Sequence, residues 1–225
     1  MSKFTAIVLS GGTGKRMQSD IPKQYLILKD KPVLAHSLLA FEESKVDDIV
    51  IVCGAGDEEF IRKEFVQKYG LSKVSAICAG GAERYDSVYN GLKACSDSDY
   101  VLIHDGARPY LSVEVIQRNI DEVIKYDAVV TAVQSLDTVK IADDEGFVTS
   151  TPDRKNVYLM QTPQTFKYEL AFDCYDKYIN ETKKCASVKA TDDAQVVEMF
   201  SDIKVKLIEG DYSNIKITVP KDLDR

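Results

Sequence analysis

The sequence predicts an α/β fold in which a mostly parallel sheet carries helices on both faces. Strand-like runs such as Ile49 to Cys53 are apolar throughout, as in strands whose two faces are both buried. Amphipathic helical patterns separate these runs, which is the alternation of a parallel sheet. The first run, Ala6 to Leu9, ends abruptly in the glycine-rich stretch Gly11 to Gly14. Open α/β sheets bind ligands at such strand ends.

The boundaries of most elements can be justified from single residues. Pro32 fits the first turn of a helix whose apolar residues keep helical spacing as far as Phe41. The acidic run 57–59 suits the positive end of another helix, and Ser112 is a helix cap. The expected strands are 6–9, 49–53, 74–78, 100–104, 128–133, 157–160, 203–208 and 215–219. The expected helices are 32–41, 57–69, 85–95, 112–124, 166–179, 192–200 and a first helical turn at 220–223.

The alternation of helices and strands breaks between about Ser135 and Met160. Residues 137–141 and 146–149 flank the acidic turn 143–146, which predicts a β-hairpin. An isolated two-stranded hairpin is only marginally stable, so we expect it to pack against another surface. A partner subunit is the natural candidate, and an ordinary surface hairpin is the alternative. Because the chain shows no repeat, low-complexity tract or linker, residues 1–225 are predicted to form a single domain.

Composition narrows the classes of function. The net charge of −7 argues against wholesale nucleic-acid binding, which needs a basic surface. No apolar run is long enough to span a membrane, and the N-terminus lacks the apolar core of a signal peptide. The five cysteines are odd in number and form no C-x-x-C pair, which favours free thiols in a reducing cytoplasm over disulfides or a zinc site. We therefore expect a cytoplasmic protein.

The stretch 10–17, followed by Lys23, predicts a cradle for a triphosphate. A strand that opens into a glycine-rich turn presents backbone N–H groups to an anion, and Arg16 and Lys23 add full positive charges. The ATP/GTP-binding loop is excluded because Gly14-Lys15 is followed by arginine instead of serine or threonine. The dinucleotide fingerprint is disfavoured because Met17 occupies its third glycine position, although a nicotinamide-dependent oxidoreductase and a catalytically silent nucleotide-binding protein remain alternatives.

Several motifs together resemble the signature of the 2-C-methyl-D-erythritol 4-phosphate cytidylyltransferases. They run in order along essentially the whole chain: Ser10-Gly11-Gly12-Thr13-Gly14-Lys15-Arg16-Met17, Pro22-Lys23-Gln24-Tyr25, Gly80-Gly81-x-x-Arg84-x-x-Ser87-Val88, His104-Asp105-x-Ala107-Arg108-Pro109, Thr162-Pro163-Gln164, Thr191-Asp192-Asp193-Ala194 and Asn214-Ile215-Lys216. Ser10 and Gly11 replace two alanines that the family often has, and Gly106 replaces another. These small-for-small changes should leave the loop open.

The resemblance implies a Rossmann-like nucleotidyltransferase fold and a defined reaction. CMP would pass from CTP to the phosphate of 2-C-methyl-D-erythritol 4-phosphate, with release of pyrophosphate, in the synthesis of isoprenoid precursors. The closely related ribitol-5-phosphate cytidylyltransferases share most of these motifs, so D-ribitol 5-phosphate is the alternative acceptor. The stretch 84–88 and the triplet Thr191-Asp192-Asp193 favour the methylerythritol substrate.

The resemblance also assigns the catalytic and nucleotide-binding residues. Arg16, Lys23 and Lys216 would be the catalytic cations. The nucleotide-binding set would be Ser10, Gly11, Gly12, Thr13, Gly14, Lys15, Gly80, Gly81, Ser87, Asp105 and Ala107. Asp105 ends a buried strand, where an unpaired carboxylate is costly, and it fits a Mg²⁺ site shared with the triphosphate. The alternative for Asp105 is a salt bridge to Arg108. His104 is interpreted as a packed strand residue, and Arg84 could equally be structural.

The acceptor would be bound by Thr138, Arg154, Thr162, Thr191 and Arg108. A guanidinium fork such as that of Arg154 is suited to clamping a phosphate. Thr138 and Arg154 flank the predicted hairpin, and in the family this arm reaches across a homodimer. The resemblance therefore implies that a neighbouring chain completes the acceptor pocket.

Overall fold

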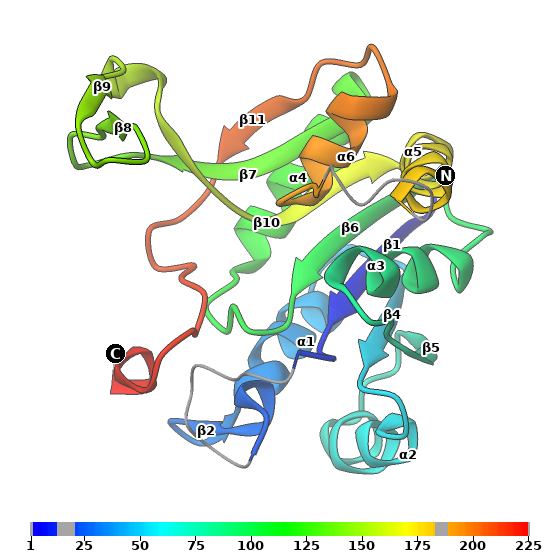
Figure 1. Ribbon diagram of the computed structural model, residues 1–225. Coiled ribbons are helices and arrows are strands. Elements are labelled where there is room, and N and C mark those ends of the chain that lie inside the picture. Colours follow the sequence, from blue (N-terminus) through cyan, green and yellow to red (C-terminus); the bar gives the residue numbers. More distant parts are fainter. Residues whose placement is uncertain (1, 13–20, 183–188, 225) are drawn as a thin grey trace.

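A seven-stranded sheet forms the centre of the computed structural model, which describes residues 2–12, 21–182 and 189–224. The strand order is β11-β7-β10-β6-β1-β4-β5 (Figure 1). The strands are β1 Phe4–Leu9, β4 Asp48–Cys53, β5 Val74–Ala79, β6 Tyr100–Asp105, β7 Ala128–Gln134, β10 Tyr158–Lys167 and β11 Lys206–Glu209. β10 runs antiparallel to β6 and β7, and the other neighbouring pairs are parallel. The predicted mostly parallel α/β sheet is confirmed.

Helices cover both faces of the sheet because successive residues of each strand face opposite ways. On β1, Ala6 and Val8 pack into one hydrophobic cluster, whereas Ile7 packs into the other. The first cluster includes residues of α1 Val33–Glu43, α2 Glu58–Ile61, the π-helical η3 Arg62–Gln67 that continues it, and α4 Val113–Tyr126. The second includes residues of α3 Arg84–Lys93, α5 Tyr168–Thr182 and α6 Asp193–Phe200. Both layers of helices are visible in Figure 1.

The end of α4 and its beginning follow the local sequence. Ser112 caps the helix, since its side chain accepts a hydrogen bond from the Val115 N–H at 3.3 Å. Asp127 ends the helix in the left-handed conformation, with φ of 59°.

Among the described residues, no helix combines the length and the apolar character that crossing a membrane requires.

The predicted boundaries around β10 are wrong. The strand continues to Lys167, and α5 begins at Tyr168 instead of near residue 166. The register of β10 against β7 shifts between Met160 and Gln164, and Pro163 lies at this irregularity, where a strand tolerates proline. Phe166 belongs to the strand because it is fully buried in the second cluster and pairs with both neighbouring strands.

Two further strand predictions need correction near the C-terminus. β11 begins at Lys206 instead of residue 203, and residues 215–219 form no strand. Ile217 is nevertheless fully buried, in a small cluster with Leu28 and Val33. Its N–H donates to the Ala107 carbonyl at 2.8 Å. The apolar residues at 215–219 are therefore explained by the burial of Ile217 and not by a strand. The predicted turn at the end of the chain is a 3₁₀ helix, η5 Pro220–Asp224.

The predicted hairpin is present and lies outside the main sheet. β8 Ile141–Ala142 pairs antiparallel with β9 Val148–Ser150, and Gly146 closes the turn with φ of 89°. A second small hairpin joins β2 Ile27–Leu28 to β3 Lys31–Pro32. In Figure 1 the β8–β9 arm projects away from the layers of helices and sheet.

The strand order creates a crevice at the carboxyl ends of β1 and β6. From β1 the chain builds β4 and β5 on one side and then returns to place β6 on the other side of β1. In the β1–β6 register Leu9 lies opposite Asp105, the last residue of each strand. Such a switch point is where open α/β sheets bind ligands. The fold therefore places the predicted site residues 10–12 and Asp105 at one edge.

Candidate active site

A cavity of about 370 Å³ opens at this switch point. It is lined by Leu9, Ser10, Gly11, Gly12, Lys23, Gln24, Gly81, Ala82, Glu83, Arg84, Ser87, Asp105, Ala107 and Lys216. Most of the predicted nucleotide-binding residues that the structure describes are therefore brought together. Thr13, Gly14, Lys15 and Arg16 are outside the described residues.

Backbone contacts and the side-chain amide of Gln24 fix the turn after β1. Ser10 is buried, and its N–H and hydroxyl both donate to the Val52 carbonyl, at 2.7 and 3.2 Å. The Gln24 side-chain amide donates to the carbonyls of Ser10 and Gly12, at 2.5 and 3.1 Å. Gly11 packs closely on the neighbouring strand end, because an added Cβ would lie 3.2 Å from the Cys53 carbonyl oxygen. These contacts engage the carbonyl groups of the turn.

A second glycine turn closes the opposite wall of the cavity. The Gly81 N–H donates to the Ser87 hydroxyl oxygen at 3.0 Å, and this hydroxyl donates to the Glu83 carbonyl at 3.2 Å. A Cβ on Gly81 would lie 2.2 Å from that of Asp86, so the turn admits no side chain there. Gly80 donates its N–H to the Cys53 carbonyl at 2.7 Å. These N–H groups therefore fix the turn itself, and Gly81 and Ser87 line the cavity.

Two predicted catalytic lysines reach the cavity from distant parts of the chain. Lys23 lies in the 3₁₀ helix η2 Lys23–Tyr25, and its Nζ donates to the Ile217 carbonyl at 2.8 Å. Lys216 comes from a C-terminal segment, residues 214–218, that passes along the Ala107–Arg108 loop. Its Nζ donates to Oδ2 of Asp105 at 2.7 Å. Both lysines therefore face the carboxyl end of the sheet.

Asp105 is a nearly buried carboxylate held between two cations. Its Oδ1 accepts from Arg84 Nε at 3.2 Å, and its Oδ2 accepts from Lys216. Burial alone would raise the pKa of Asp105, but the charges of Arg84 and Lys216 outweigh it and hold that pKa well below its usual range. The carboxylate is thus ionised at neutral pH. The alternative salt bridge with Arg108 is wrong as stated, because the ion pairs of Asp105 are with Arg84 and Lys216.

Arg108 and His104 have structural contacts. Arg108 donates through Nη1 to the Asn214 carbonyl at 2.7 Å and through Nη2 to the Met160 carbonyl at 3.3 Å. His104 is fully buried, stacks edge-on against Phe41 and hydrogen-bonds Thr162 Oγ1 through Nδ1 at 2.9 Å. Burial lowers the pKa of His104 to about 3, so the ring is neutral. The interpretation of His104 as a packed strand residue is confirmed.

A second cavity of about 270 Å³ adjoins the first. It is lined by Arg84, Asp105, Arg108, Met160, Gln161, Thr162, Gln164, Thr191, Asp192 and Lys216. Three of these residues, Arg84, Asp105 and Lys216, also line the first cavity. They therefore form a shared wall between the two spaces. Three of the five predicted acceptor residues, Thr162, Thr191 and Arg108, line the second cavity.

The other two predicted acceptor residues lie elsewhere. Thr138 and Arg154 are exposed near the base of the β8–β9 arm, and neither lines either cavity. Arg154, in the 3₁₀ helix η4 Arg154–Asn156, donates through Nη1 to the Leu136 carbonyl at 3.2 Å. The described part of one chain thus does not bring these two residues to the shared wall.

The carboxylate chemistry of the site suits one hard cation bound jointly with a ligand. Among the described residues, no group of three or more His, Cys, Asp and Glu side chains is arranged to hold a metal ion. Mg²⁺ typically needs only one or two carboxylates when substrate phosphates supply further oxygens. Asp105, ionised and facing both cavities, fits that role.

Several functional candidates were not found from the sequence. Gln24 stands inside the motif Pro22-Lys23-Gln24-Tyr25, and its side chain donates to two carbonyls of the turn after β1. Asp193 and Tyr175 were assigned no role, although both are buried and Asp193 pairs with Arg84. Alternation of polar and apolar residues could not reveal them, because their contacts are not local: Gln24 reaches residues 12 and 14 positions back, and Asp193 pairs with Arg84, 109 positions away.

Fold and site together define an α/β nucleotidyltransferase. A glycine turn, two lysines and an ionised carboxylate gather at the switch point of a mostly parallel sheet, next to a second cavity.

Comparison with known proteins specifies the family. The model of the 2-C-methyl-D-erythritol 4-phosphate cytidylyltransferase family matches residues 4–225. The enzyme of that name from Lachnoclostridium phytofermentans is 48% identical over 223 residues, which cover 99% of this chain and 94% of the relative. The one from Alkaliphilus oremlandii is 45% identical over 225 residues, covering 99% and 93%. The chain belongs to the 2-C-methyl-D-erythritol 4-phosphate cytidylyltransferase family.

Solved structures agree with this assignment. A 4-diphosphocytidyl-2C-methyl-D-erythritol synthase from Anaerococcus prevotii matches with a TM-score of 0.86 at 38% identity, covering 99% of this chain and 93% of that one. The 2-C-methyl-D-erythritol 4-phosphate cytidylyltransferase from Thermus thermophilus matches with a TM-score of 0.77 at 26% identity, covering 100% and 96%. The resemblance drawn from the sequence motifs is confirmed.

Proposed function

We propose that this protein transfers the cytidylyl group of CTP to the phosphate of 2-C-methyl-D-erythritol 4-phosphate and releases pyrophosphate. The product is 4-diphosphocytidyl-2-C-methyl-D-erythritol, an intermediate of isoprenoid synthesis. Relatives that share 45% and 48% of the sequence are named for this acceptor, so ribitol phosphate is not favoured. The observation that carries the proposal is the shared wall of Arg84, Asp105 and Lys216 between two adjoining cavities.

The larger cavity would hold CTP. The turn after β1 would offer the N–H groups of Gly11 and Gly12 to phosphates, and Gly81 and Ser87 would lie close to the base and ribose. Lys23 would contact the triphosphate. Thr13 to Arg16, which the resemblance also assigns to the triphosphate, lie outside the described residues and remain part of the proposal.

The reaction is a displacement at the α-phosphorus of CTP. An oxygen of the acceptor phosphate forms a bond to that phosphorus, and the bond to the β-phosphate oxygen breaks to release pyrophosphate. A phosphate monoester has a second pKa near 6, so the nucleophile is already largely dianionic at neutral pH. No general base is needed. The protein's task is to align two anions and to stabilise charge that develops on the α-phosphate.

Lys216 and Lys23 are suited to that electrostatic task. Lys216 lies at the shared wall, where the two substrates would meet, and Lys23 lies on the side of the glycine turn. We propose that Asp105 holds Mg²⁺ together with phosphate oxygens of CTP. When bound, the ion would neutralise phosphate charge and polarise the phosphorus centre. In that state Lys216 would turn from Asp105 towards the α-phosphate.

The acceptor would occupy the smaller cavity, where Thr162, Thr191 and Arg108 lie. The exposed arm supports the further proposal of a homodimer. Large apolar side chains on the arm and next to its base face solvent: Ile141, Phe147 and Val148 on the arm, and Leu136, Tyr158 and Leu159 beside it. Several exposed large apolar side chains in one region are typical of an interface. Arg154 and Thr138 would then complete the acceptor pocket of the partner subunit.

Two further proposals concern the whole chain. Residues 1–225 would act as a single nucleotidyltransferase domain, supported by the one seven-stranded sheet with helices on both faces. A cytoplasmic location is supported by the free thiols of Cys53, Cys78, Cys95 and Cys174.

The proposed reaction can be tested by pyrophosphate release. The protein is incubated with CTP and Mg²⁺ and with one acceptor at a time: 2-C-methyl-D-erythritol 4-phosphate, D-ribitol 5-phosphate or D-erythritol 4-phosphate. We expect pyrophosphate with the methylerythritol substrate at a rate at least about tenfold above the other two. Faster release with ribitol phosphate would move the protein to the alternative acceptor. Release with none of the three would contradict the proposed function.

A further inference from the structure

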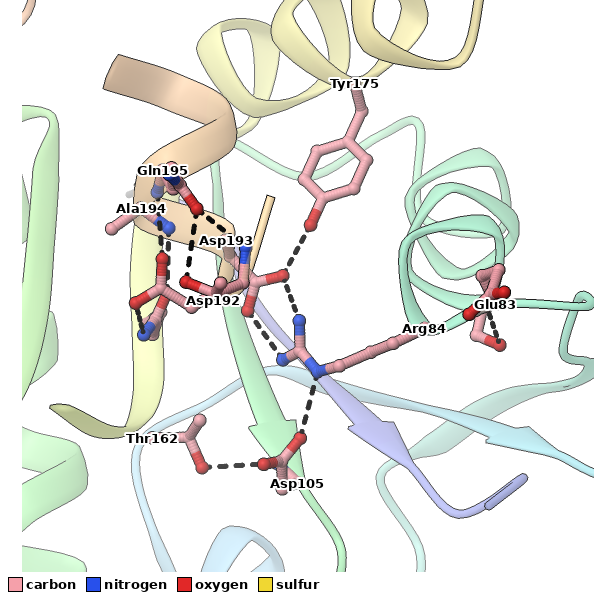
Figure 2. Close-up of polar contacts among 12 residues, drawn as sticks. Glu83, Arg84, Asp105, Thr162, Tyr175, Asp192, Asp193, Ala194 and Gln195 are labelled. Carbon is pink, nitrogen blue, oxygen red and sulfur yellow. Dashed lines mark hydrogen bonds and ion pairs between the residues drawn. The ribbon is translucent and has the colours of Figure 1, made fainter. Parts of the chain in front are cut away.

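A chain of polar contacts connects helix α5 to the carboxylate of Asp105 (Figure 2). The Tyr175 hydroxyl donates to Oδ1 of Asp193. The Asp193 carboxylate accepts from Nη1 and Nη2 of Arg84, at 2.6 and 2.7 Å. Arg84 Nε then donates to Oδ1 of Asp105 at 3.2 Å. The four residues come from α5, α6, α3 and β6, so four elements meet in this contact chain.

Asp193 fixes which part of the Arg84 guanidinium faces the site. Its carboxylate has no solvent exposure and occupies both terminal nitrogens of Arg84, which leaves Nε for Asp105. Burial alone would lower the pKa of Arg84, but the carboxylates of Asp193 and Asp105 more than offset it. The guanidinium is therefore held as a charged fork with a fixed orientation.

This arrangement divides the two oxygens of Asp105 between two cations. Arg84 contacts Oδ1, while Oδ2 stays with Lys216 at 2.7 Å. If Arg84 were released from Asp193, its two terminal nitrogens could turn to Asp105 and form a bidentate pair with both oxygens. Such a pair would draw the carboxylate away from Lys216 and from any ligand at the shared wall.

We infer that Asp193 and Tyr175 are positioning residues that orient the Asp105 carboxylate through Arg84. Neither residue lines the proposed nucleotide cavity or the acceptor cavity. The inference rests on the proposed cytidylyl transfer. It extends that proposal because it places residues outside both cavities in control of the chemical step. Tyr175 aims the Asp193 carboxylate, and Asp193 in turn fixes the guanidinium of Arg84.

The test compares Asp193→Asn and Tyr175→Phe with the wild-type protein. The first variant keeps the side-chain shape and removes the charge, and the second removes one hydroxyl. We expect kcat for pyrophosphate release to fall about tenfold in Asp193→Asn and about threefold in Tyr175→Phe, with KM for CTP within about twofold of the wild type. Tyr89→Phe is the matched control, because the Tyr89 hydroxyl also joins two helices, donating to Asp176 at 2.6 Å, but contacts neither Arg84 nor Asp105.

A purely structural role predicts a different result. Thermal unfolding is recorded for each variant, and rates are measured well below every midpoint. Unchanged kcat in both folded variants, or an equal fall in Tyr89→Phe, would overturn the inference. If Asp193→Asn does not fold, Tyr175→Phe decides alone. A wild-type protein that releases no pyrophosphate would overturn the proposed function itself. An active wild type with unaffected variants would overturn only the inference about Asp193 and Tyr175.

A double-mutant cycle adds a second readout. In Arg84→Gln the guanidinium is gone, so a further change of Asp193 to Asn has nothing left to orient. We expect the double variant to have a kcat within about twofold of Arg84→Gln alone. Additive losses would show that Asp193 acts by a route other than Arg84.

Discussion

At the residue scale, Gln24 shows how a neutral side chain can prepare an anion site. It is buried beside the turn after β1, and its amide nitrogen donates to the carbonyls of Ser10 and Gly12. A buried carbonyl that faces a bound phosphate would repel it. By engaging these carbonyls, Gln24 would leave the N–H groups of Gly11 and Gly12 as the polar groups that the proposed triphosphate meets.

Gln24→Ala should therefore weaken nucleotide binding more than it slows the chemical step. We expect KM for CTP to rise about tenfold and kcat to fall no more than about threefold, because Lys23 and Lys216, the proposed catalytic lysines, are retained. Steady-state kinetics with varied CTP measures both values. Gln117→Ala is the control, since Gln117 is a half-buried residue of α4 whose side chain donates to Asp121. A KM for CTP unchanged by Gln24→Ala would remove this role.

At the element scale, the C-terminal segment 214–218 joins the two halves of the site without being a strand. Arg108 donates to the Asn214 carbonyl, Lys23 donates to the Ile217 carbonyl, and Asn214 donates to the Thr162 carbonyl at 2.9 Å. These contacts fix the backbone on either side of Lys216. The segment thus aims Lys216 at the shared wall by backbone contacts instead of sheet pairing.

These elements also show how much of the fold could be predicted from the sequence. Continuous apolar runs were enough to predict β1, β4, β6 and β7, because a strand buried on both faces leaves that pattern. The end of β10 was not predictable, since Pro163 suggested a break that the sheet absorbs as an irregularity. Lys216 pairs with Asp105, 111 positions away, and such a contact leaves no local pattern. Only the family resemblance therefore pointed to Lys216. The Arg84–Asp193 pair, 109 positions apart, left no local signal that fixed its role.

The β8–β9 arm yields a prediction at the same scale. Phe147 is 68% exposed on the arm, so Phe147→Glu would place a charge in the proposed interface. We expect the dissociation constant of the dimer to rise at least about tenfold and the acceptor KM to rise with it, because Arg154 and Thr138 would no longer reach the partner's cavity. Sedimentation velocity and kinetics measure both. Ile124→Glu is the control, since Ile124 is 53% exposed on α4. An unaltered dimer, or a monomeric wild type, would contradict the interface.

At the scale of the whole molecule, buried thiols on both faces of the sheet make the stability of the folded protein depend on pH. Burial raises the pKa of Cys53 and of Cys95 to about 12. Cys53 packs in the first hydrophobic cluster and Cys95 in the second. Both thiols stay protonated in the folded state at a pH where the unfolded chain has already lost these protons.

The folded protein should therefore lose stability as the pH rises from about 9 to about 12. In that window the folded state binds more protons than the unfolded state, so the free energy of unfolding falls by up to about 1.4 kcal/mol per pH unit for each thiol. Urea unfolding at pH 8 and pH 10.5 measures the change. Cys95→Ala should show a smaller loss between the two values than the wild type. An equal loss in both proteins would refute the contribution of Cys95.

In the proposed reaction Lys216 acts where the two cavities meet. The most direct measurement is the initial rate of pyrophosphate release by Lys216→Met at saturating CTP, Mg²⁺ and 2-C-methyl-D-erythritol 4-phosphate. We expect kcat to fall at least about 100-fold, because a cation that stabilises charge at the transition state is lost, while the thermal midpoint stays near that of the wild type. A folded Lys216→Met protein that releases pyrophosphate within about threefold of the wild-type rate would contradict the account.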